Sequence, residues 1–165
     1  MIATLRPAGA LFIASAVAAC AAPSTADDPA RVPPVLGQDA IEAWFAAGYY
    51  LRWTCEDPRA TAAPSPHGAI RRCTNPIAAA AGVDAVDAAL VVELQDGGGA
   101  ITGRAAQRHT RPELAGEAWY WYLRDATGLV ADGWGFEGPP QTDCAACHQR
   151  AGQDLPGQDY VFDDH

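Results

Sequence analysis

The residues most able to do chemistry lie near the C-terminus, where the chain reads Cys144-Ala145-Ala146-Cys147-His148. Side chains three positions apart share one face of a helix, so both thiols could reach one edge of a flat ligand. The imidazole of His148 could then bind a metal ion at the centre of that ligand from the same side. Cys-x-x-Cys-His is the attachment pattern of c-type haem. The motif predicts one covalent haem c, with Cys144 and Cys147 as anchors and His148 as the proximal iron ligand.

Two other interpretations of the motif stay open. A Cys-x-x-Cys pair alone can be a thioredoxin-like dithiol or half of a structural zinc site. A zinc site needs a second ligand pair at similar spacing, and Cys55 and Cys73 lie too far apart to be one. A thioredoxin-like dithiol expects a preceding strand, whereas Gly138-Pro139-Pro140-Gln141 comes before this motif. We therefore favour haem attachment.

The N-terminal segment predicts export. Residues 1–19 combine one charge, Arg6, with a short apolar run and small residues before Cys20, which are the parts of a secretory signal peptide. Val17-Ala18-Ala19-Cys20 is similar to a bacterial lipobox, in which the chain is cut before the cysteine and the cysteine is acylated. An ordinary signal peptide, cut without lipidation, is the alternative.

This cleavage would divide the chain into three parts. After the signal peptide of residues 1–19, residues 20–36 are rich in Ala, Pro and Asp and predict a flexible tether. Residues 37–165 are long enough for one domain with one core. We expect the lipid on Cys20 to hold this domain at the periplasmic face of a bacterial membrane, with no other membrane contact.

The acidic balance of the chain argues against nucleic acid as a partner. Its 11 Lys and Arg residues against 20 Asp and Glu residues give a formal net charge of −9, which repels phosphate backbones and anionic headgroups. Solubility explains the acidity most simply, although a small basic redox protein would also fit. All 11 positive residues are arginine.

Each of the five cysteines has an assignment. Cys20 takes the lipid, and Cys144 with Cys147 takes the haem. Cys55 and Cys73 remain, and in an exported protein such a pair is most simply a disulfide. A disulfide between them would close a loop of 18 residues. Closing such a loop would stabilise the fold by about 3 kcal/mol.

The elements that must position the motif are predicted to be a few helices and a sheet. Residues 38–53 predict an amphipathic helix with Asp39 as its cap. Asn75-Pro76 predicts the start of a short Ala-rich helix that ends at Gly82. The apolar stripe of the first helix comprises Ile41, Trp44, Phe45, Gly48 and Leu51.

Strands are predicted between the first helix and the motif. The motif itself predicts a short helix, capped by Thr142 or Asp143 and ended by Gly152. The strands fall at 69–74, 88–95, 100–110, 117–124 and 129–134, with turns at 96–99 and 125–128. The predicted fold class is therefore α+β: a mainly antiparallel β-sheet with an N-terminal helix and a C-terminal haem-bearing helix.

This order of parts resembles the cytochrome P-460 and cytochrome c′-beta family. Most small cytochromes c carry the haem motif near the N-terminus of an all-helical domain and use a later methionine as second iron ligand. Here the motif is C-terminal, a sheet precedes it, and the single methionine is Met1. The segments that carry the resemblance are Pro66-His67-Gly68 with Ile70 and Asn75, Val91-Val92-Glu93-Leu94, Trp119-Tyr120-Trp121, the haem motif, and Asp159-Tyr160-Val161-Phe162.

The resemblance implies a haem held by Cys144, Cys147 and His148. The enzymatic members of that family carry a lysine cross-linked to the porphyrin and oxidise hydroxylamine. This chain has no lysine, so the resemblance favours the c′-beta type, a pentacoordinate haem protein that binds gases such as nitric oxide. A cross-link from Tyr120 or Tyr122 instead of lysine would keep the enzymatic alternative open. A homodimer is a further candidate assembly of this chain.

Several further residues are candidates for the haem surroundings, although each is more often an ordinary surface or core residue. Candidate sixth ligands are His67, His109 and His165. Candidate pocket walls are Trp119, Trp121, Trp134 and Phe136. Candidate distal acids are Glu93, Glu113, Glu117 and Glu137.

Three functions follow from these observations. The first is a lipid-anchored monohaem cytochrome c that transfers electrons or binds nitric oxide or carbon monoxide at an open distal site. The second is a haem enzyme that oxidises hydroxylamine or a related small nitrogen compound. The third is an exported lipoprotein whose motif is a structural metal or disulfide element. We favour the first and assign no catalytic residue.

Overall fold

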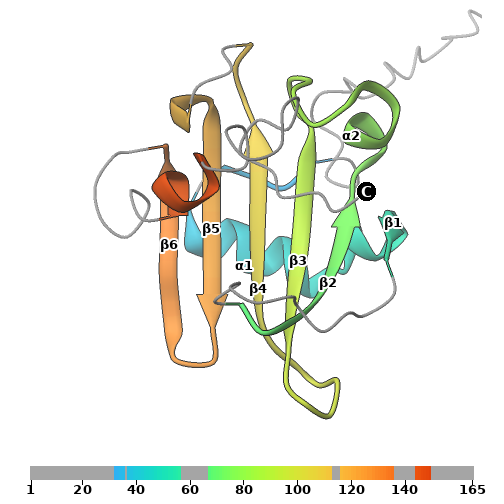
Figure 1. Cartoon of the computed structure of the whole chain (residues 1–165), viewed down its shortest axis with the longest axis vertical. Coiled ribbons are helices and arrows are strands. Elements are labelled where there is room, and N and C mark those ends of the chain that lie inside the picture. Colours follow the sequence, from blue (N-terminus) through green and yellow to red (C-terminus); the bar gives the residue numbers. More distant parts are fainter. Residues whose placement is uncertain (1–31, 36, 57–66, 113–115, 136–143, 150–165) are drawn as a thin grey trace, which may run out of the picture.

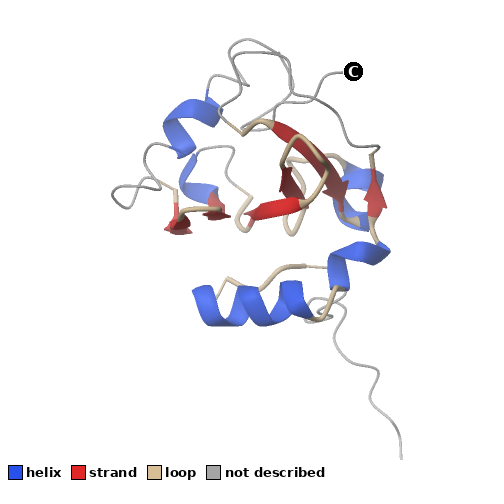
Figure 2. Ribbon diagram, turned by 90° about the horizontal axis from the view of Figure 1, so that it is seen from below, coloured by secondary structure: helices blue, strands red, loops and turns tan. Residues whose placement is uncertain are grey.

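The computed structural model describes residues 32–35, 37–56, 67–112, 116–135 and 144–149. They form an α+β fold around one six-stranded sheet, whose strands lie side by side in sequence order from β1 to β6. Every neighbouring pair is antiparallel. One helix, α1, covers one face of the sheet, and the helical residues 144–149 lie on the other (Figures 1 and 2).

The strands follow the sequence pattern closely, and the predicted hairpins are confirmed. The short edge strand β1 was not predicted from the sequence. The bounds are β1 Thr54–Cys55, β2 Ala69–Thr74, β3 Ala89–Gln95, β4 Ile101–His109, β5 Trp119–Asp125 and β6 Gly128–Trp134. The shorter helices are α2, Pro76–Ala81, and the 3-10 turns η2, Tyr49–Arg52, and η3, Gly116–Ala118.

The first helix is shorter than its pattern predicts. α1 spans Gln38–Ala46, and Gly48 then takes a positive φ of 67°, a conformation that ends helices. The chain continues as η2, a 3-10 turn with fewer residues per turn than an α-helix. The positions that face the core therefore differ from those that a continuous α-helix would give. Tyr50 is therefore buried, whereas Leu51, expected on the stripe, is 58% exposed.

The expected cap of α1 was also wrong. Gly37 stands at the N-cap position and has no side chain to accept a capping hydrogen bond, and Asp39 lies in the first turn. A carboxylate there still favours the helix, because the N-terminal end of the helix dipole is positive.

In the described part of the chain, no helix has the length and apolarity needed to cross a membrane.

The two faces of the sheet bury different side chains, because successive residues of a strand point to opposite sides. The α1 face carries Val91, Ala106, Tyr120 and Tyr122, which pack with Ile41, Trp44 and Phe45 of α1. The opposite face, called here the motif face, carries Leu90, Trp119 and Trp121, which pack with Ala145. The alternation of Trp and Tyr over residues 119–122 thus separates two cores.

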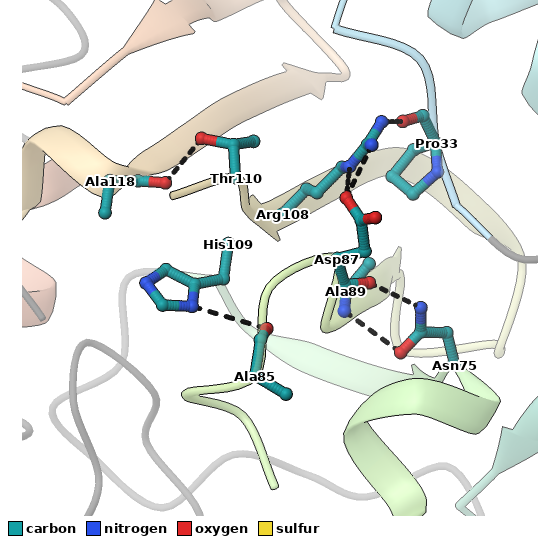
Figure 3. A network of polar contacts seen from close by, with 9 residues as sticks. All are labelled: Pro33, Asn75, Ala85, Asp87, Ala89, Arg108, His109, Thr110 and Ala118. Atoms are coloured by element: carbon teal, nitrogen blue, oxygen red, sulfur yellow. Dashed lines mark hydrogen bonds and ion pairs between the residues drawn. The ribbon is translucent and has the colours of Figure 1, made fainter. Parts of the chain in front are cut away.

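Asn75 joins α2 to the sheet (Figure 3). It is fully buried. Its Oδ1 accepts hydrogen bonds from the N–H of Ala78, at 2.9 Å, and of Ala89, at 3.0 Å, and its Nδ2 donates to the carbonyl of Asp87 at 2.8 Å. The predicted N-cap is confirmed, and the same side chain also holds the start of β3.

We expect Asn75→Ala to lower the free energy of unfolding by about 2–3 kcal/mol, because it removes a helix cap and leaves buried backbone groups without their partners. The matched control is Asp96→Ala. Asp96 also accepts from two backbone N–H groups, those of Gly98 and Ala100, but in an exposed turn, so we expect less than about 1 kcal/mol. Urea unfolding followed by circular dichroism measures both, and equal losses would contradict the account.

The disulfide between Cys55 and Cys73 is present, as predicted. The two residues are direct partners across β1 and β2, and Cys73 is fully buried in the core under α1. The bond therefore fastens the short edge strand to the sheet.

We expect the double substitution Cys55→Ala and Cys73→Ala to lower the free energy of unfolding by about 3 kcal/mol, since the crosslink closes a loop of 18 residues. Urea unfolding of oxidised wild type, wild type in reductant and the double variant measures the effect. Reductant should lower the stability of the wild type and leave the variant unchanged. A variant as stable as the oxidised wild type would overturn this prediction.

Candidate functional site

The Cys-x-x-Cys-His motif lies on the helical residues 144–149, which pack on the motif face of the sheet. Ala145 is fully buried against Leu90, Trp119 and Trp121. Because helix positions three apart share a side, His148 lies on the same side of this helix as Ala145. Cys144 is partly buried at the edge of this cluster, and Cys147 is also partly buried. The predicted ends of the helix, Thr142, Asp143 and Gly152, lie outside the described residues.

Four aromatic rings form a row beside this helix. The His148 ring lies 5.0 Å from the Trp121 ring, centroid to centroid. Trp121 lies 5.9 Å from Trp119, and Trp119 lies 4.9 Å from His109. In β5 and β4 these residues are cross-strand neighbours, with Trp119 opposite His109 and Trp121 opposite Gln107. Trp119 and Trp121, two of the expected pocket walls, are therefore beside the motif.

The sheet surface next to Trp121 is apolar and partly exposed. Val92 of β3, Ala105 of β4 and Leu123 of β5 are register partners in one row on the motif face. With strands about 4.8 Å apart, this row is about 10 Å wide. All three side chains are partly exposed. Such a row offers a porphyrin the apolar cover that it needs.

The chemistry of the described residues fits a c-type haem. Two thiols and an imidazole stand on one helix, and the helix borders an apolar sheet face. Trp119 adds a further sign of a missing partner. Its side chain is fully buried, and its Nε1 has no hydrogen-bond acceptor among the described residues. A buried N–H without an acceptor is costly, so an oxygen-bearing group absent from the described residues would stabilise it.

Trp134, another expected pocket wall, lies on the wrong face. It is the partner of Tyr120 across β5 and β6. Its ring packs edge-on against Tyr120 at 5.6 Å and belongs to the core under α1. The guanidinium of Arg111 lies 5.3 Å from its ring centroid. Phe136 lies outside the described residues.

Tyr120 and Tyr122 are also on the α1 face, so the conceivable tyrosine cross-link to haem is not supported. The Tyr120 hydroxyl donates to Asp132, and the Tyr122 hydroxyl donates to Glu42 of α1. Burial and these hydrogen bonds raise the pKa of both phenols well above the ordinary value. Both are therefore structural donors in the core.

One of the expected distal acids, Glu93, lies on the face of the sheet away from the motif. Glu93 is on the α1 face, where it accepts hydrogen bonds from Arg71 and Tyr50. Glu117 is exposed, and Glu113 and Glu137 lie outside the described residues. Within the described ranges, no three His, Cys, Asp or Glu side chains are grouped so as to hold a metal ion.

The candidate sixth ligands have separate positions. His109 is fully buried, and its Nδ1 lies 3.3 Å from the carbonyl oxygen of Ala85 (Figure 3). Two tryptophan rings stand between His109 and His148, so these imidazoles are not brought together. His67 lines a cavity further along the motif face. His165 lies outside the described residues.

Sequence reasoning missed that cavity. Its lining joins the segment before β2 to the ends of three strands, and no local motif signals such a meeting. The lining residues are His67, Leu94, Thr102, Leu123, Asp125, Ala126 and Thr127. The period-two alternation that places Leu94 and Leu123 on one face was the available signal.

Comparison with known proteins finds no matching family model, no similar curated protein and no similar solved structure.

Proposed function

We propose that this chain is a monohaem c-type cytochrome that binds a diatomic gas, such as nitric oxide or carbon monoxide, at an open distal position of the iron. The observation that carries the proposal is the packing of the Cys144–His148 helix against Trp119 and Trp121. The resemblance to the cytochrome P-460 and c′-beta family supports it. Haem, when bound, supplies a redox centre and a coordination position for a small ligand.

The residues of this chain divide the remaining tasks. Cys144 and Cys147 hold the porphyrin by thioether bonds, and His148 binds the iron. The row of Val92, Ala105 and Leu123 excludes water from one side of the site. Neither the lone methionine, Met1, nor the distant His109 competes for the second axial position, which favours gas binding over electron transfer alone.

The proposed setting is the periplasmic side of a bacterial membrane, with Cys20 acylated and residues 20–36 as a tether. The Cys55–Cys73 disulfide supports this setting, because such bonds persist in oxidising compartments. Within that setting, the partners are a small redox protein or the gas itself. Hydroxylamine oxidation is a weaker candidate, since the chain has no lysine to cross-link.

The test is to produce the full chain with its leader in a bacterium that matures c-type cytochromes. Intact mass after denaturation should exceed the mass of the processed polypeptide and its lipid by one haem. The reduced protein should give a five-coordinate, high-spin optical spectrum that changes with carbon monoxide. A six-coordinate, low-spin spectrum indifferent to gas would favour electron transfer, and the absence of covalent haem would refute the proposal.

A further inference from the structure

The helix that carries the motif is held on the sheet by one of its own residues. Ala145 is fully buried among Leu90, Trp119 and Trp121. Because Ala145 and His148 share one side of the helix, the contact that buries Ala145 also brings the His148 ring to the sheet. The position of His148 is therefore set by the packing of its helix.

Trp121 is the sheet residue in contact with the His148 ring. The two ring centroids are 5.0 Å apart, and the ring planes are inclined by 55°. Favourable aromatic pairs have centroids about 4.5–7 Å apart and prefer some relative orientations over others. The Trp121 ring therefore restricts how the imidazole of His148 turns about its Cβ–Cγ bond.

Trp121 has little freedom of its own. Its side chain is 4% exposed, and the Trp119 ring lies 5.9 Å away on the same face. Its strand, β5, lies between β4 and β6, where Trp121 pairs with Gln107 on one side and Gly133 on the other. A histidine, by contrast, has a broad torsional preference about its Cβ–Cγ bond. In this pair the tryptophan is therefore the fixed ring, and the imidazole is the ring whose orientation is determined.

We infer that Trp121 is a positioning residue for His148 and sets the orientation in which its imidazole binds the haem iron. Residues that contact a metal-bound histidine orient its ring and tune the metal. The orientation decides how directly the nitrogen lone pair points at the iron, and so how strong the bond is. An aromatic contact of this kind favours one orientation about 2- to 10-fold. This inference rests on the proposed function and adds to it the residue that sets the iron–imidazole bond.

The experiment compares wild type, Trp121→Leu and Trp119→Leu, each as the haem-loaded full chain. Trp119 is the matched control, because it shares the strand, the face and the buried cluster of Trp121 but lies with its ring against His109. Resonance Raman spectra of the ferrous protein give the iron–imidazole stretching band. We expect Trp121→Leu to broaden this band and shift it to lower frequency, because a less restricted imidazole binds in several orientations. Trp119→Leu should leave the band at its wild-type position.

The outcomes separate this inference from the proposed function. A Trp121→Leu variant that carries haem and keeps the wild-type band would overturn the role of Trp121. Equal shifts in both variants would do the same, because loosening of the whole cluster would explain them. If Trp121→Leu does not fold, Trp121→Met takes its place with the same expected shift, since methionine fills irregular gaps in a core. Wild type without covalent haem, or without five-coordinate ferrous iron, would refute the proposed function, which the first two outcomes leave standing.

Discussion

Replacement of both motif cysteines, Cys144→Ala with Cys147→Ala, is expected to abolish covalent haem attachment completely. Each thioether needs a cysteine sulfur, and the chain has no second pair at this spacing. The measurement is the intact mass of the denatured protein, together with the absorbance of haem that remains on the chain. A double variant that still carries the mass of one haem would contradict the assignment of the motif.

The fold should survive this substitution. Cys144 is at the edge of the motif-face cluster, whereas Ala145 supplies its buried contact with Trp119 and Trp121. The matched control is Cys55→Ala with Cys73→Ala, which removes the same number of cysteines from the opposite face. We expect that control to lose stability and keep its haem. Loss of haem from the control as well would show that attachment also depends on the stability of the fold.

The second large effect is expected at Glu93, the buried carboxylate of the α1 face. Glu93 is 1% exposed. Arg71 donates two hydrogen bonds to it, at 2.6 and 2.9 Å, and the Tyr50 hydroxyl donates a third at 2.7 Å. Arg104 donates in turn to Tyr50 at 3.2 Å. The cluster joins β2, β3, β4 and η2, so its loss would disturb the centre of the sheet.

Glu93→Gln should lower the free energy of unfolding by about 2–4 kcal/mol. Removing one partner of a buried ion pair costs 3–5 kcal/mol, and the lower bound here reflects Arg71, which is 29% exposed and can be hydrated. The matched control is Arg124→Gln, which removes the charge from the more exposed Arg124–Glu42 pair. That control should cost less than about 1 kcal/mol. Chemical unfolding at neutral pH measures both variants.

Acidification supplies an independent check on Glu93. Burial by itself raises the pKa of this carboxyl, but the hydrogen bonds from Arg71 and Tyr50 outweigh burial and lower the pKa below its ordinary value of 4.5. The unfolded chain therefore takes up the proton first as the pH falls. The stabilisation is complete above about pH 4.5 and is lost as the pH drops through the folded-state pKa. The stability gap between wild type and Glu93→Gln should narrow below pH 4.5, and a gap independent of pH would refute this explanation.

Local patterns determined the elements of this protein. Asn75-Pro76 and Gly82 mark the two ends of α2 because capping, a fixed proline φ and a glycine C-cap depend on neighbouring residues alone. The hairpins and the Cys55–Cys73 pair were also predictable, since turn residues and unassigned cysteines are visible in the sequence. The Cys144–His148 motif is equally local, because its five-residue spacing is the whole of the signal that predicts haem attachment.

Only the tertiary structure decided which side of the sheet each side chain serves. Trp121 and Trp134 are both aromatic strand residues, yet one touches the motif helix and the other packs under α1. Period-two alternation divides each strand into two faces but does not say which face a distant helix will cover. The tertiary structure also decided that Tyr50, not Leu51, is buried in the core. It likewise brought Arg71 to Glu93 and placed His67 and Leu123 in the lining of one cavity. Each depends on strand register and on contacts between segments far apart in the chain, which no short window of sequence contains.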